Sequence, residues 1–175
     1  MKRITVTVIL IGLLLAACSR WNVEPKTTAS GSGTGTGTDG SKTVFSKGQV
    51  SVPGLKGYDL DAGKITDDGA LPADFYWNVE TYAGKSRADL YAHNGAKFTI
   101  TTLDVSVLDR QPSTLYTTLT QQTYTDYPIA TDSSIPIRLG TVIAFQTNEG
   151  RYGIFRVDRL GTDLVLAITW LTYVK

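Results

Sequence analysis

The sequence predicts a mainly β fold, either an antiparallel β-sandwich or a partly open barrel, with at most one short helix. Segments of alternating apolar and polar residues recur through residues 43–175, and turns rich in glycine, asparagine or proline separate them. Only one segment in this range has helical spacing. We therefore expect a single antiparallel β domain in residues 43–175, long enough to bury one core.

Residues 1–17 have the parts of a secretory signal peptide. Lys2 and Arg3 precede an apolar run, and small residues follow it. The run is shorter than the roughly 20 residues that a membrane-spanning helix needs. An ordinary secretory signal with a chance cysteine is the alternative. Cys18 is the only cysteine of the chain, so it has no disulfide partner within it.

The four residues Leu15-Ala16-Ala17-Cys18 resemble the lipobox of bacterial lipoproteins. The resemblance implies that the signal is removed and that Cys18 carries the lipid, so the chain's partner is a lipid bilayer. Two or three acyl chains hold a protein stably on a membrane. The resemblance also implies a place in the cell envelope. We expect the outer membrane if the source is Gram-negative, and otherwise the outer face of the cytoplasmic membrane.

Residues 18–42 are a predicted flexible linker rich in glycine, threonine and serine, with little to bury. They contain a match to the dinucleotide-binding pattern of glycines at Gly35, Gly37 and Gly40. That pattern needs a strand before it and a helix after it, and this linker offers neither, so we expect no cofactor. The formal net charge is +1, which indicates no nucleic-acid partner.

The first strands of the domain are expected at residues 49–52 and in a hairpin at residues 56–66. Gly63 can adopt the positive φ that closes such a hairpin. Four acids in and beside the hairpin raise the alternative of a calcium loop, but the glycine and glutamate of an EF-hand are missing from the required positions. We therefore expect them to be solvated turn residues: Asp59, Asp61, Asp67 and Asp68.

Residues 74–79 form the aromatic centre of the N-terminal half. On a strand, Phe75 and Trp77 share one face and Tyr76 lies on the other. We expect Phe75 and Trp77 to lie in the core. The alternative is an exposed aromatic platform for a sugar ring.

Residues 87–91 and 97–101 are two further predicted strands, and Asn94-Gly95 between them predicts a hairpin turn. His93, the only histidine, is expected to be exposed to solvent beside this turn. With one histidine and no cysteine beyond Cys18, we expect no metal site. Leu103, Val105 and Val107 continue the strand-like alternation.

Residues 112–119 are the helical candidate, with Ser113 as a possible cap, and residues 123–136 look like a long loop. Tyrosines in or near this loop, together with the outward tyrosine of the aromatic strand, form a possible ligand surface: Tyr76, Tyr116, Tyr124 and Tyr127. Packing of the loop onto the core would explain the loop tyrosines equally well.

The C-terminal third predicts an antiparallel meander of strands at residues 140–147, 151–158 and 164–174. Residues 164–171 are largely apolar on both faces, which indicates a central strand covered on both sides or a strand that closes a barrel. Residues 140–153 and 170–173 resemble a β-rich module of uncharacterised bacterial envelope proteins, a resemblance that implies no activity.

No catalytic set is visible in the sequence. The G-x-S-x-G pattern is absent, and His93 has no motif serine to act with. We expect no catalytic residues and a non-catalytic binding or structural module that contacts an envelope protein or a glycan. The alternative is a cell-wall glycan hydrolase, which would require two carboxylates such as Asp74 and Glu80 to converge in a cleft.

Overall fold

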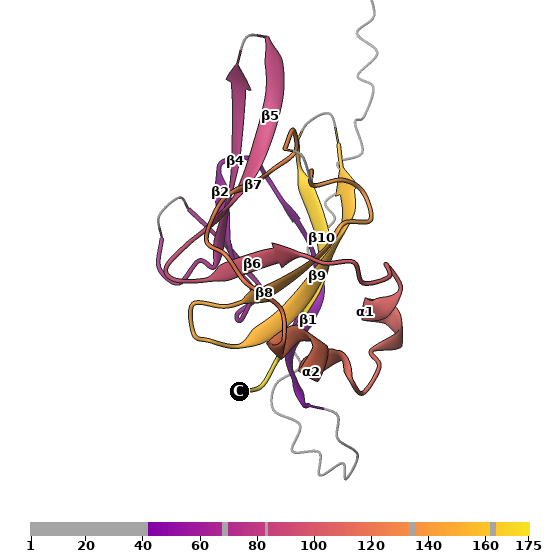
Figure 1. Cartoon of the computed structure of the whole chain (residues 1–175). Helices are drawn as coiled ribbons and strands as arrows, with labels where there is room; N and C mark the ends of the chain where they lie inside the picture. Colours follow the sequence, from indigo (N-terminus) through magenta and orange to yellow (C-terminus); the bar gives the residue numbers. More distant parts are fainter. Residues whose placement is uncertain (1–41, 68–69, 83, 134–135, 162–163) are drawn as a thin grey trace, which may run out of the picture.

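The computed structural model describes residues 42–67, 70–82, 84–133, 136–161 and 164–175, which form two packed antiparallel sheets (Figure 1). Each sheet has five strands and two edge strands. The predicted β-rich fold is therefore confirmed, in its sandwich form. None of the helices in the described residues is long and apolar enough to cross a membrane.

The first sheet, called sheet A, contains the C-terminal meander. Its strands are, in spatial order, β1 (Val44–Val52), β10 (Leu166–Tyr173), β9 (Tyr152–Leu160), β8 (Val142–Gln146) and β6 (Lys97–Ile100). Strands β8, β9 and β10 are consecutive antiparallel neighbours, as predicted. Because β10 lies between β1 and β9, its apolar composition on both faces is that of an interior strand.

The second sheet, called sheet B, contains the predicted hairpin and the aromatic strand. Its strands are, in spatial order, β3 (Lys64–Thr66), β2 (Lys56–Asp59), β4 (Phe75–Tyr82), β5 (Lys85–Ala92) and β7 (Ile129–Ala130). Gly63 has φ +66° at the tip between β2 and β3, as expected. The β4–β5 hairpin extends well beyond the rest of the domain (Figure 1).

The Asn94-Gly95 turn exists, but it is not a hairpin turn. Both residues have positive φ, as this dipeptide predicts. The strands on either side of it lie in different sheets, because β5 pairs with β4 and β7 whereas β6 pairs with β8. The turn therefore carries the chain from one layer of the sandwich to the other.

Two short helices follow β6: α1 (Val107–Arg110) and α2 (Leu115–Thr120). The expected strand pattern at Leu103, Val105 and Val107 is wrong, because the Asp104 carboxylate accepts hydrogen bonds from the backbone and hydroxyl of Ser106 and turns the chain into α1.

The second helix, α2, is the predicted one. Its N-cap is Thr114 rather than Ser113, and no side-chain hydrogen bond caps it.

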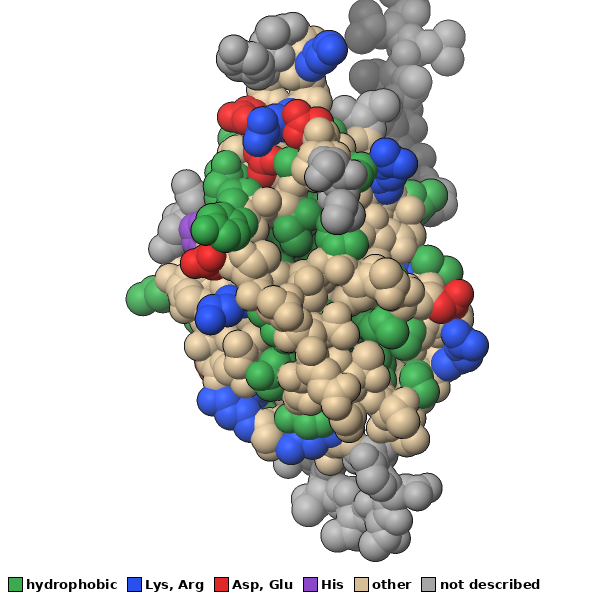
Figure 2. Space-filling model, in the orientation of Figure 1, with side chains coloured by type: hydrophobic (Ala, Val, Ile, Leu, Met, Phe, Trp, Pro, Cys, Tyr) green, Lys and Arg blue, Asp and Glu red, His purple; other side chains and the backbone are tan. Residues whose placement is uncertain are grey.

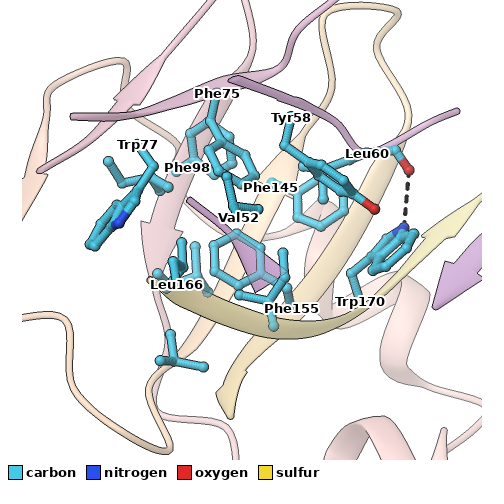
Figure 3. Packing of buried hydrophobic residues seen from close by; sticks show 14 of the residues in the cluster. Val52, Tyr58, Leu60, Phe75, Trp77, Phe98, Phe145, Phe155, Leu166 and Trp170 are labelled. Atoms are coloured by element: carbon cyan, nitrogen blue, oxygen red, sulfur yellow. Dashed lines mark hydrogen bonds between the residues drawn. The ribbon is translucent and has the colours of Figure 1, made fainter. Parts of the chain in front are cut away.

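The main core lies between the two sheets (Figure 3). Its largest fully buried side chains are Tyr58, Phe75, Trp77, Phe98, Phe145 and Phe155. The Trp170 ring stands edge-on to Tyr58 at 5.3 Å between centroids, and its Nε1–H donates to the Leu60 carbonyl at 3.1 Å. Phe75 and Trp77 are thus core residues, as predicted.

A second apolar cluster covers the other face of sheet A. Leu108, Leu115 and Leu119 of the two helices pack there against side chains of β8, β9 and β10. In Figure 1 both helices lie on the side of sheet A that faces away from sheet B. The molecule therefore has three layers, and the two described helices leave the outer face of sheet B to other contacts.

Candidate functional site

The candidate site is the outer face of sheet B along the β4–β5 hairpin. Side chains on a strand alternate between faces, so Tyr76 points outward because its neighbours Phe75 and Trp77 point into the core. Tyr91 lies directly opposite Tyr76 in the antiparallel register and therefore shares its face. Both tyrosines are half-buried. Sheet B thus carries two tyrosines side by side on its outer face.

His93 holds the ring of Tyr76 from one side. The two rings are 5.8 Å apart between centroids and are tilted by 36°. His93 is half-buried, so the expected full exposure is not found. The contact restricts the orientations open to the tyrosine ring.

A charged cluster occupies the same face closer to the hairpin tip. The Arg87 guanidinium lies 3.1 Å from a carboxylate oxygen of Asp89, 3.3 Å from Glu80 and 3.8 Å from Asp132. Asp89 is fully buried beneath the arginine, whereas the side chains of Glu80 and Asp132 are about half exposed. Figure 2 shows acidic and basic side chains gathered over this hairpin.

The structure separates the four tyrosines predicted to form one ligand surface. Tyr76 is in the candidate site, and Tyr127, 77% exposed, lies two residues before β7, the strand that pairs with β5. Tyr116 and Tyr124 are instead in the helix layer, where both contact Tyr152. These two tyrosines pack onto the core, which is the alternative that the sequence left open.

A small pocket lies at the edge of the helix layer. It has a volume of about 170 Å³ and lies beside Tyr116, whose ring is 5.2 Å from the Lys42 ammonium. Most of its lining comes from the chain around Pro112 and from β1. The volume is too small for an extended polymer, so we do not place the ligand surface there.

A buried carboxylate connects the two sheets just before β4, where the Asp74 carbonyl accepts the backbone N–H of His93 at 2.8 Å. Asp74 is fully buried, and its two oxygens accept the backbone N–H groups of Leu60 and Asn148, each at 2.8 Å. Burial raises the pKa of Asp74 to about 7, against the lowering effect of these two donors. The residue thus joins the β2–β3 turn of sheet B to the β8–β9 turn of sheet A.

Two of the four acids expected to be solvated are buried instead. Asp59 is 4% exposed because its carboxylate accepts the backbone N–H groups of Asp61 and Ala62. Asp61 is 9% exposed and pairs with Arg151 at 3.0 Å. Burial raises the pKa of Asp61, against the effect of Thr147 and Arg151. The hairpin tip therefore packs against the body of the protein.

Asp67 and Asp68 are the other two acids expected to be solvated. Asp67 is exposed and pairs with Lys56 at 2.6 Å, as a turn residue would. Asp68 lies outside the described residues.

The two acids named for the hydrolase alternative, Asp74 and Glu80, do not lie together. Asp74 and Glu80 are six residues apart along one strand direction, which places them roughly 20 Å from each other. Asp74 is also fully buried, so its carboxylate cannot contact a polymeric substrate. Within the described ranges, no three histidine, cysteine, aspartate or glutamate side chains are placed to hold a metal ion.

Tyr91 and the Arg87 cluster were not identified from the sequence. The strand at residues 87–91 was predicted, but only its register with β4 places Tyr91 beside Tyr76. Cys18, the predicted lipidation site, lies outside the described residues. No known protein family, curated protein or solved structure matches this chain.

Proposed function

We propose that this protein is a lipid-anchored, non-catalytic binding module of the bacterial cell envelope. Its anchor is acylated Cys18, its tether is residues 18–42, and its ligand surface is the outer face of sheet B. The observation that carries the proposal is the cross-strand pair of half-exposed tyrosines, Tyr76 and Tyr91, on the sheet face away from the helix layer.

The division of the molecule into layers supports this choice of face. The outer face of sheet A is occupied by α1, α2 and the loop tyrosines. Sheet B has side chains suited to recognition on its outer face, since Tyr and Arg are the residues most enriched at the centres of binding surfaces. A rigid two-strand scaffold also holds such side chains more firmly than a loop.

The proposal is tested with the full chain in two steps. Wild type should incorporate labelled fatty acid supplied to growing cells and the Cys18→Ser variant should not, because the variant lacks the sulfur that carries the lipid. Purified wild type in detergent is then mixed with envelope material from which lipid has been extracted with detergent, so that the anchor has no bilayer to enter, and is sedimented. The Tyr91→Ala variant should remain in the supernatant, whereas Tyr116→Ala, a half-buried tyrosine of the helix layer, should sediment like wild type. Equal sedimentation of Tyr91→Ala and wild type would contradict the proposal.

A further inference from the structure

We infer that the ligand of this face is a glycan whose sugar units carry free amino groups. The inference rests on the proposed function, because it names the class of ligand for the same surface. It follows from three features: the tyrosine pair, the polar residue beside it, and the excess of negative charge at the end of the same face.

The tyrosine pair suits the apolar side of a sugar ring. Side chains directly opposite each other on neighbouring antiparallel strands have Cβ atoms about 5 Å apart, so Tyr76 and Tyr91 leave the sheet side by side. His93 already orders the Tyr76 ring, which lowers the entropy lost on binding. Rigid tyrosines supply a large contact area with few rotatable bonds.

The next position along the face supplies polar groups. Asn78 lies two residues from Tyr76 on β4 and shares its face, opposite Asp89. Its half-buried amide offers both hydrogen-bond donors and an acceptor, which match sugar hydroxyls. An aromatic and a polar side chain therefore follow each other along this face of the hairpin, two residues apart on β4.

The charge of the face selects among glycans. Three carboxylates, Glu80, Asp89 and Asp132, surround the single guanidinium of Arg87, which leaves an excess of negative charge. Lys85, two residues from Arg87 on the same face of β5, offsets a second carboxylate and leaves an excess of one negative charge. Phosphate or carboxylate groups on a glycan would be repelled here, whereas ammonium groups would be attracted.

The length of the face indicates an oligomer. Tyr91 and Arg87 are four residues apart on β5, which corresponds to roughly 13 Å along the strand. A single sugar cannot contact both the tyrosine pair and the exposed carboxylate of Glu80, which lies opposite Arg87. Ring stacking at one end and charge pairing at the other therefore require several linked units.

The test is a calorimetric titration of the full chain in detergent with two probes, a glucosamine oligomer and an N-acetylglucosamine oligomer of equal length. The first should bind at least about tenfold more tightly, because only its amino groups are charged. High salt should weaken that binding by screening the charge. Glu80→Gln should weaken it several-fold, whereas Glu149→Gln, an exposed carboxylate paired with Arg151 in another part of the molecule, should not.

The tyrosine variants separate the inference from the proposed function. Tyr91→Ala should abolish binding of the glucosamine oligomer, and Tyr91→Phe, which keeps the ring, should bind like wild type. Circular dichroism shows whether each variant is folded.

Equal or tighter binding of the acetylated oligomer would overturn the inference, and so would envelope binding that depends on Tyr91 without binding of either oligomer. In both cases the proposed function stands. Oligomer and envelope binding that do not depend on Tyr91 would overturn both.

Discussion

The buried carboxylate of Asp74 should make the stability of the domain depend on pH in a direction opposite to that of most paired acids. Burial raises its pKa from an ordinary value of 3.8 to about 7 in the folded state. Between these two values the folded protein retains a proton that the unfolded chain releases. The contribution of Asp74 to the free energy of unfolding is therefore fully present below about pH 4 and is lost as the pH rises toward 7.

The size of the effect follows from the shift. One pKa unit corresponds to about 1.4 kcal/mol, so the free energy of unfolding should fall by roughly 4 kcal/mol over this interval. Other acids also titrate, and the burial that raises the pKa of Asp61 acts in the same direction. A comparison with an Asp74 variant isolates the contribution of Asp74.

The suitable variant is Asp74→Asn, which has the shape of the protonated acid. Urea unfolding of both proteins, followed by tryptophan fluorescence at several pH values from 4 to 7, gives the two stability curves. The variant should be less stable than wild type at pH 4, because its NH2 group cannot accept one of the two backbone N–H groups, and it should lack most of the decline at higher pH. Parallel curves would contradict this prediction, because they would mean that Asp74 titrates alike in both states.

Three further predictions concern single residues. Trp170→Phe should lower the free energy of unfolding by about 1 kcal/mol or more, because it removes one of three side-chain donors to the Leu60 carbonyl and leaves part of the space of the indole ring unfilled, and urea unfolding measures this. Gly153→Ala should destabilise by about 2 kcal/mol or more, because its Cβ would lie 2.2 Å from the Phe145 ring, and an unchanged thermal midpoint would contradict the packing described here. Mass spectrometry of the mature N-terminal peptide should find lipid on Cys18, and an unmodified Cys18 with signal residues still attached would contradict the anchor.

The strands of the C-terminal meander could be predicted from the sequence because their signals are local. Residues 140–147 and 151–158 are rich in β-branched and aromatic residues, and a short turn separates them, so the pairing of neighbours follows directly. The position of the turn at Asn94-Gly95 could also be predicted from the dipeptide itself. Which strands the turn connects could not be predicted, because β6 pairs with β8, whose residues lie far away in the sequence.

The candidate site and the buried acids could not be predicted because they depend on long-range contacts. Asp74 is stabilised by N–H groups of Leu60 and Asn148, and the second of these is 74 residues away. Tyr91 became a site residue only through its register with Tyr76. Alternation along one strand gives the face of a side chain but not its neighbour across the sheet.

The most direct test of the ligand surface is photo-crosslinking in living cells of the source organism. A photoreactive amino acid is placed in the full chain at the position of Tyr91 and, as a control, at the position of Thr117, an exposed residue of α2. Crosslinks to envelope material are expected from the first position and none from the second. Crosslinks from the α2 position alone would contradict the assignment of the outer face of sheet B as the ligand surface.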